Sequence, residues 1–277
     1  MAIPYAEVIG DPIDHSLSPA IHRFWLGKLG KDVDYRATRV TADELPSYLE
    51  ARRADPDWLG CNVTMPLKRR ILPLVDRRLE GAKVAGSANL VMKLPAADIG
   101  WPHDGLTANN TDLRGFAEPF RRAYPERGSA AIIGAGGAAR AAFVALAALG
   151  FTIVHVTNRT RSNAEAMLRE FGQAHAADLA FDLDAPIPVV DLLVNAGAIG
   201  DRGGALDLSA LPPSAVVYDI VYDPLETPLL AAARRHGLRT IDGLDMLMGQ
   251  AAASFVHFFE SEPPREHDEE LRRMLTS

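Results

Sequence analysis

The chain has 277 residues, of which 48% are hydrophobic and 23% are charged. At roughly 150 residues per domain this length predicts two domains, and the composition is that of an ordinary globular protein, not a disordered or fibrous one. The formal net charge is −7 at pH 7, so no overall basic field attracts a nucleic acid or an anionic membrane. We therefore expect small molecules as partners, and neither nucleic acid nor membrane.

Cysteine usage and the N-terminal residues bear on the compartment. Cys61 is the only cysteine in the sequence, so no internal disulfide can form. No apolar run reaches the roughly 20 residues of a membrane helix, and residues 1–5 lack the basic stretch and apolar run of a secretory signal. These features favour a reducing, cytoplasmic location.

Short apolar runs alternate with longer helical patterns in the first part of the chain, which is typical of α/β proteins. A helix is expected to start at Pro19, with Ser18 as its N-cap and Gly30 as its stop. Two further helices are expected over residues 41–54 and 113–122. The expected strands are residues 5–10, 33–40, 59–63, 88–93 and 106–108.

A polar, turn-rich stretch at residues 124–128 separates this part from a second one, in which the strand pattern begins afresh. A helical stretch over residues 245–260 and a charged surface helix end the chain. The strands expected in the second part are residues 130–133, 152–157, 189–194, 216–221 and 238–241. This order predicts a doubly wound parallel sheet.

A glycine-rich turn at residues 134–139 joins the strand at 130–133 to a helix at 140–149, which Gly150 closes. Such a turn lets the backbone approach a pyrophosphate, and the helix N-terminus supplies unpaired N–H groups. Because the turn lies between a strand and a helix, a dinucleotide site is favoured over a tight turn without a ligand. The expected contacts come from Gly134, Gly136, Gly137 and Ala138.

The end of the next expected strand indicates which dinucleotide binds. NAD enzymes usually carry Asp or Glu there for the ribose 2′-hydroxyl, whereas this chain has Asn158, Arg159, Thr160 and Arg161. Guanidinium groups pair bidentately with phosphate oxygens, so we predict NADP. The alternative for both arginines is a solvated loop.

Lys68 occupies an unusual place if residues 62–68 run from a strand into a helix, with Thr64 as cap and Pro66 in the first turn. A cation near a helix start faces the positive end of the dipole, which lowers the pKa of the amine and suits it to proton transfer. An equally good interpretation is that Lys68 belongs with Arg69 and Arg70 to an exposed basic cluster without a catalytic role.

Two more polar segments precede expected helix starts. Asp112 suits the start of its helix, and beside Lys68 it would keep the amine charged and oriented. Ser16 and Ser18 can bind a carboxylate together with free N–H groups, although capping alone would explain Ser18. The eight histidines show no ligand spacing, so we predict no metal.

Taken together, five motifs in this order resemble the shikimate dehydrogenase family from end to end. They lie at residues 10–19, 62–68, 109–112 and 134–161, and at residues 222–224 with 249–250. The resemblance implies a two-lobed fold with a substrate domain at 1–112 and 243–277, a Rossmann NADP domain at 113–242, and C-terminal helices that return to the first lobe.

The resemblance also implies the reversible reduction of 3-dehydroshikimate to shikimate with NADPH, a step toward aromatic amino acids, by a monomer or homodimer. Lys68 and Asp112 would handle the proton. The substrate ligands would be Ser16, Ser18 and Tyr222 for the carboxylate, and Thr64, Asn89 and Gln250 for the ring hydroxyls.

Four positions depart from the family pattern: Leu90, Asn163, the stretch 195–198 and Asp245. They keep two alternatives open. One is a relative that oxidises quinate or another shikimate analogue, with NAD as coenzyme. The other is a dinucleotide-binding sensor without turnover, against which the Lys68 and Asp112 pair argues.

Overall fold

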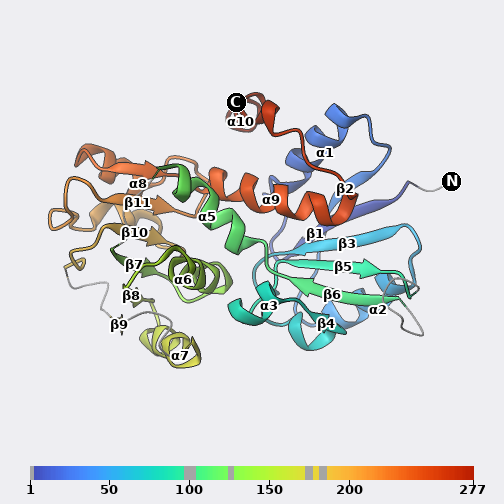
Figure 1. Cartoon of the computed structure of the whole chain (residues 1–277), viewed down its shortest axis with the longest axis horizontal. Helices are drawn as coiled ribbons and strands as arrows, with labels where there is room; N and C mark the ends of the chain where they lie inside the picture. Colours follow the sequence, from blue (N-terminus) through green and yellow to red (C-terminus); the bar gives the residue numbers. More distant parts are fainter. Residues whose placement is uncertain (1–2, 97–103, 124–127, 172–176, 181–185) are drawn as a thin grey trace. The chain divides into compact units, whose positions relative to one another are not determined.

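The computed structural model describes residues 3–96, 104–123, 128–171, 177–180 and 186–277. The chain divides into two compact units, unit 1 (Met1–Thr111 with Gln250–Ser277) and unit 2 (Asp112–Gly249). Within the described residues each unit is built on a six-stranded sheet with helices, which is the α/β fold class that the sequence predicts (Figure 1). Most of the predicted turn at 124–128 lies outside the described residues.

Unit 1 has a mixed sheet with the strand order β2-β1-β3-β5-β6-β4. Its strands are β1 (Tyr5–Gly10), β2 (Asp34–Arg39), β3 (Trp58–Val63), β4 (Arg77–Arg78), β5 (Leu90–Leu94) and β6 (Gly105–Asn109). Its helices are α1 (Ser18–Leu29), α2 (Leu45–Ala54), α3 (Glu80–Ala85), the end of α9 (Gly243–Phe259) and α10 (Asp268–Thr276), with the 3-10 turns η1 (Leu72–Leu74) and η3 (Arg265–His267).

Strand directions in unit 1 bring several chain segments to one edge of the sheet. β1 and β3 are parallel, whereas β5 is antiparallel to both β3 and β6. The ends of β1, β3 and β6 and the start of β5 therefore meet, as the pairing of Leu90 with Asn62 and with Asn109 demonstrates. We call this the carboxyl edge of unit 1.

The predicted start of α1 is wrong by one residue. Ser18 is the first helical residue, and Leu17, which already has αR dihedral angles, occupies the N-cap without a side-chain bond. The Oγ atom of Ser16 instead accepts the N–H of Ser18 at 3.3 Å. The predicted stop is confirmed, because Gly30 ends the helix with a φ of 63°.

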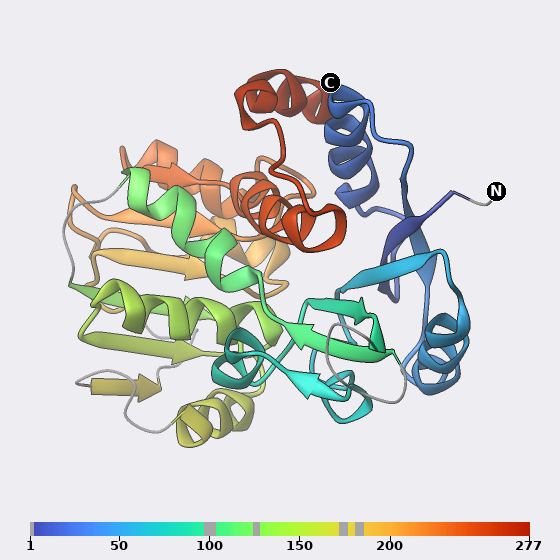
Figure 2. The same cartoon turned by 45° about the vertical axis from the view of Figure 1, so that its right-hand side comes forward.

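The C-terminal segment returns to unit 1. In Figure 2 α10 lies beside α1, and Lys28 of α1 donates to Glu270 of α10 at 2.8 Å. The rings of Phe255 and Phe259 at the end of α9 pack around His22 of α1, at centroid distances of 5.8 and 6.0 Å.

Unit 2 has a parallel sheet with the order β12-β11-β10-β7-β8-β9. Its strands are β7 (Ser129–Ile133), β8 (Ile153–Thr157), β9 (Ala177–Ala180), β10 (Leu192–Asn195), β11 (Val216–Asp219) and β12 (Arg239–Ile241). Its helices are α5 (Asp112–Ala123), α6 (Gly137–Leu149), α7 (Arg161–Phe171), α8 (Pro228–Arg235) and the start of α9, with the 3-10 turn η2 (Gly200–Ala205).

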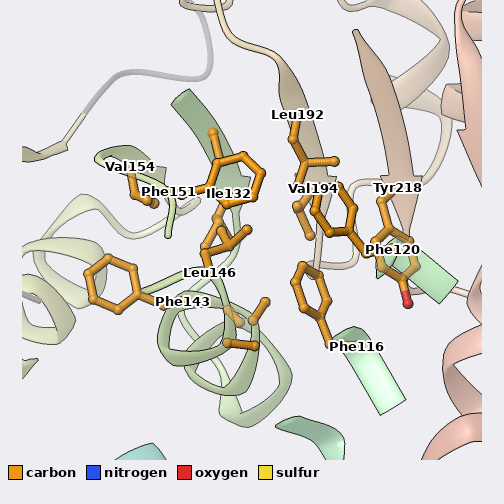
Figure 3. Packing of buried hydrophobic residues seen from close by; sticks show 14 of the residues in the cluster. Phe116, Phe120, Ile132, Phe143, Leu146, Phe151, Val154, Leu192, Val194 and Tyr218 are labelled. Carbon is orange, nitrogen blue, oxygen red and sulfur yellow. The ribbon is translucent and has the colours of Figure 1, made fainter. Parts of the chain in front are cut away.

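Both faces of this sheet are buried, as expected for parallel strands. Residues of α5, α6 and α7 pack on one face, where Phe116 stacks on Tyr218 at 5.0 Å (Figure 3). The alternate strand residues, such as Ile133 and Val217, pack on the other face against α8. Unit 2 is therefore a three-layer sandwich whose core is independent of unit 1.

The division between the units runs through α9, whereas the sequence interpretation began the returning segment at residue 243. Met246, in the first turn of α9, packs with Ile241 in the core of unit 2, which explains why the helix starts with that unit. None of the helices in the described part of the chain has the length and apolar character that crossing a membrane demands.

Candidate functional site

The glycine-rich turn of unit 2 has backbone geometry that excludes larger residues. Gly134 has a φ of 121°, and a Cβ atom on it would lie 2.8 Å from the carbonyl oxygen of Ala196, directly after β10. Its N–H donates to the carbonyl oxygen of Thr157 at 2.7 Å. Gly134 therefore brings together the ends of β7, β8 and β10.

The position of this turn in the sheet matters for binding. Numbered from β7 along the chain, the strand order is 3-2-1-4-5-6, which reverses between β7 and β10. In open parallel sheets, ligands bind outside the carboxyl ends of the strands at this switch point. Gly134 lies at the switch point of unit 2.

The first turn of α6 fits a pyrophosphate. Gly136 is its N-cap and makes no side-chain cap bond, and nothing lies within 4 Å of the place where its Cβ would stand. The space beside Gly136 is therefore open to a ligand, and Gly137 and Ala138 contribute N–H groups that no side chain caps. Ala139 is fully buried, which allows close packing of helix against strand.

Residues after β8 present the polar groups predicted for a 2′-phosphate. Arg159 and Thr160 are exposed, while the Nδ2 atom of Asn158 donates to the carbonyl oxygen of Thr160 at 3.0 Å. Arg161 begins α7 and donates to Glu165 at 3.0 Å. Arg159 is thus the guanidinium best suited to an incoming phosphate, and Arg161 would have to exchange partners.

A buried carboxylate fixes the segment after β11. Asp219 accepts hydrogen bonds from the Nδ2 of Asn195 at 2.8 Å, the Oγ1 of Thr227 at 2.7 Å and the N–H of Val221 at 3.0 Å. Burial raises the pKa of the Asp219 carboxyl above its usual value. Tyr222 lies on this segment and is half-buried.

In unit 1 the structure contradicts the predicted helix start at Lys68. Residues 65–70 form consecutive turns, with Leu67 N–H donating to the Thr64 carbonyl at 2.9 Å, and no α-helix follows directly. The argument from a helix dipole therefore does not apply to Lys68. Two prolines, Pro66 and Pro73, restrict helical pairing in this segment.

Tertiary contacts still hold this turn at the carboxyl edge. Thr64 N–H donates to the Ile9 carbonyl at 2.9 Å, and the carbonyl of Lys68 accepts the N–H of Ala88 at 2.8 Å. A Cβ on Gly10 would lie 2.4 Å from the Cγ2 of Thr64, so only glycine allows this approach. Lys68 is half-buried. Its backbone is hydrogen-bonded to Ala88, the residue directly before Asn89.

Two predicted substrate ligands of unit 1 are in direct contact. Asn89 and Gln250 are 2% and 7% exposed, and the Nδ2 of Asn89 donates to the Oε1 of Gln250 at 3.2 Å. Thr111 joins them, because its N–H donates to the Oδ1 of Asn89 at 2.6 Å. Residues 161 positions apart thus form one polar cluster at the carboxyl edge.

The other predicted residues stand near helix starts. Ser18 is buried and Ser16 half-buried at the start of α1. Asp112 is the first residue of α5 and is 3% exposed. Sequence reasoning did not single out Thr111 or Ser254 as functional, although Thr111 lies inside the motif that supplied Asp112. Within the described ranges there is no group of three His, Cys, Asp or Glu residues able to hold a metal ion.

The strand order and the glycine-rich turn define a two-unit α/β protein of the Rossmann class. Two family models match the chain, the shikimate dehydrogenase substrate binding domain at residues 8–91 and shikimate / quinate 5-dehydrogenase at residues 123–200. A shikimate dehydrogenase (NADP(+)) from Sphingopyxis alaskensis is 47% identical over 280 residues, covering 100% of this chain and 98% of the relative. The chain belongs to the shikimate dehydrogenase family of oxidoreductases.

Solved structures agree with this membership. Shikimate 5-dehydrogenase from Thermus thermophilus, in complex with NADP(H) and shikimate, has a TM-score of 0.83 and 34% identity, with 99% of this chain and 100% of that chain covered. Quinate dehydrogenase from Corynebacterium glutamicum, in complex with NAD, also has a TM-score of 0.83, with 29% identity and coverage of 98% and 99%. The fold therefore does not separate the two substrates or the two coenzymes.

Proposed function

We propose that the protein is an NADP-dependent shikimate dehydrogenase that reversibly reduces 3-dehydroshikimate to shikimate, a step in the biosynthesis of aromatic amino acids. The observation that carries this proposal is the buried cluster of Asn89, Thr111 and Gln250 at the carboxyl edge of unit 1. Amides held in fixed orientations suit the recognition of several hydroxyl groups on one ring. The names of the relatives support the same substrate and coenzyme.

Each site residue has a role in this proposal. Asn89, Gln250 and Thr64 bind the ring hydroxyls. Ser16, Ser18 and Tyr222 bind the carboxylate through hydroxyl donors. Lys68 gives a proton to the carbonyl oxygen during reduction and takes it back during oxidation, and Asp112 is the second member of this proton-handling pair.

Unit 2 contributes the coenzyme site. The N–H groups at Gly136, Gly137 and Ala138 would hold the pyrophosphate, Gly134 allows the close approach of the backbone, and residues 158–161 would hold the 2′-phosphate. NADPH, when bound, supplies the hydride. The cytoplasmic location and the monomeric or homodimeric state stay predictions.

A four-way assay tests this proposal. The purified protein is mixed with shikimate or quinate and with NADP or NAD, and the absorbance of the reduced nicotinamide is followed. We expect the highest kcat/KM with shikimate and NADP. Turnover with quinate and NAD alone would assign the protein to the quinate type, which the likeness to quinate dehydrogenase keeps as the second candidate. Coenzyme binding without any turnover would indicate a sensor.

Arg159→Ala should weaken NADP far more than NAD, because Arg159 is exposed at the end of β8 and pairs with a phosphate that NAD lacks. A hydrogen bond between charged groups is worth about 1.5–3 kcal/mol, so the KM for NADP should rise roughly 10- to 100-fold. Arg169→Ala, in the last turn of the α7 helix that follows this segment, is the matched control. An unchanged ratio of the two KM values would remove Arg159 from the coenzyme site.

A further inference from the structure

Ser254 of α9 has a fully buried hydroxyl that contacts three other polar groups. Its Oγ accepts from the Nδ2 of Asn62 at 2.8 Å, donates to the carbonyl oxygen of Gln250 at 3.0 Å, and lies 3.1 Å from the Oγ1 of Thr111. All four residues belong to unit 1. Ser254 of α9 is therefore connected to Asn62 in β3 and to Thr111, two residues after the end of β6.

The directions of these hydrogen bonds follow from counting protons. A serine hydroxyl has one proton and two acceptor positions. Because the Ser254 proton goes to the Gln250 carbonyl, the Ser254 Oγ is an acceptor toward the Thr111 hydroxyl, which has the Oδ1 of Asn89, 3.2 Å away, as a second acceptor. The Thr111 Oγ1 then accepts from the Nδ2 of Asn89, 2.9 Å away. The Thr111 hydroxyl thus lies between Ser254 and Asn89 and contacts both.

The Asn89 amide beside Thr111 has a fixed orientation. Its Oδ1 accepts the N–H of Thr111, so its Nδ2 must point to the Oγ1 of Thr111 and to the Oε1 of Gln250. The Gln250 side-chain amide is oriented in turn, because its Oε1 faces Asn89. Ser254 thus acts on both proposed ligands, on Asn89 through Thr111 and on the Gln250 backbone directly.

The chain of hydrogen bonds continues on the far side of Ser254. The Oδ1 of Asn62 accepts from the buried hydroxyl of Tyr35 in β2 at 2.6 Å, and its Nδ2 also donates to the Asn89 carbonyl at 3.0 Å. A buried polar group without a partner costs free energy, so most such groups are hydrogen-bonded. Removing the Ser254 hydroxyl would leave one buried N–H of Asn62 without its acceptor and would remove one of the partners of the Thr111 hydroxyl.

Helix propensity gives no reason for a serine at this position. Three alanines precede Ser254, and alanine is the better helix former, whereas a serine that donates to the carbonyl four residues back slightly weakens a helix. We propose that Ser254 is a positioning residue that sets the orientation of Asn89 and Gln250 for the substrate ring hydroxyls. This inference rests on the proposed function of those two amides.

Ser254→Ala tests the inference by steady-state kinetics. We expect the KM for shikimate to rise about tenfold, roughly the worth of one hydrogen bond to the substrate, because the two amides lose their fixed orientation, while kcat changes less and the KM for NADP stays the same. Ser47→Ala is the control, because the Ser47 hydroxyl also donates back to a carbonyl in its helix, at Glu44 O, but is exposed in α2. A merely structural role would raise both KM values together.

A double-mutant cycle with Thr111→Val separates positioning from loss of stability. Both substitutions break the same hydrogen bond. The double variant should therefore have a shikimate KM close to that of the single variant with the higher KM. If the KM increases of the two single variants multiplied in the double variant, the proposed coupling would be overturned. An unchanged shikimate KM in a folded, active Ser254→Ala variant would overturn the role itself.

A measurement without turnover keeps the two proposals distinguishable. An inactive wild-type protein would contradict the proposed function, and the role of Ser254 would then be decided by hydrogen exchange of the Asn62 and Asn89 side-chain amides in NMR spectra. We expect slow exchange in the wild type and faster exchange in Ser254→Ala. Equal exchange in both would contradict the positioning role.

Discussion

Lys68→Ala should lower kcat for shikimate oxidation by about 10²- to 10⁴-fold, the range that positioned proton transfer contributes. The binding of NADP should stay unchanged, because the proposed coenzyme contacts all belong to unit 2 and Lys68 belongs to unit 1. The backbone of Lys68 is held by Ala88, next to Asn89, which places this residue beside the polar cluster at the carboxyl edge. The measurement is steady-state kinetics together with titration of NADPH fluorescence.

Arg70→Ala is the matched control for Lys68→Ala, since it removes an exposed cation two residues along the same turn. It should leave kcat unchanged. If Lys68→Ala weakened catalysis and NADP binding by equal factors, the lysine would be structural, and the proton would have to come from another group.

His22 should make the protein lose stability in acid. It is fully buried, stacked 4.0 Å from Tyr35, and neither ring nitrogen has a hydrogen-bond partner among the described residues. Burial lowers the pKa of the His22 imidazole from 6.5 to about 3. As the pH falls through 6.5 the unfolded chain takes up a proton that the folded chain takes up only near pH 3, so stability that is present above pH 6.5 is lost progressively below it.

His22→Phe should remove this acid sensitivity, because a phenyl ring keeps the stacking and carries no titrating group. At pH 5 the interval from 6.5 is 1.5 units, which corresponds to about 2 kcal/mol of unfolding free energy in favour of the variant. The measurement is urea unfolding at pH 7 and pH 5, with the exposed His15→Gln as control. An equal loss in wild type and His22→Phe between these pH values would show that His22 is not the cause.

The sequence predicts the elements with strong hydrophobic patterns and misses those without one. The apolar run before the glycine-rich turn marks β7, and Gly150 marks the end of α6. The edge strands β4 and β9 are short and have polar residues such as Arg77, Arg78 and Asp178, so only their pairing with β6 and β8 defines them. Pairing is a tertiary property that a local pattern does not contain.

The same limit applies to the candidate site. The sequence and the family resemblance single out Asn89 and Gln250, but not the hydrogen bonds through Thr111 and Ser254, which join residues 22 and 143 positions apart. Local rules also misplaced Lys68, because Thr64 and Pro66 resemble a helix start where the chain forms turns held by Ile9 and Ala88. What fixes Lys68 is the sheet edge and not a helix.

The transfer of deuterium from shikimate to NADP tests the central claim most directly. Shikimate that carries deuterium on the carbon of the oxidised hydroxyl is incubated with the protein and NADP, and the coenzyme is analysed by mass spectrometry. We predict that the reduced coenzyme gains one deuterium, because the hydrogen moves as a hydride between two bound partners. Reduced coenzyme without deuterium, or no reduced coenzyme at all, would contradict the account.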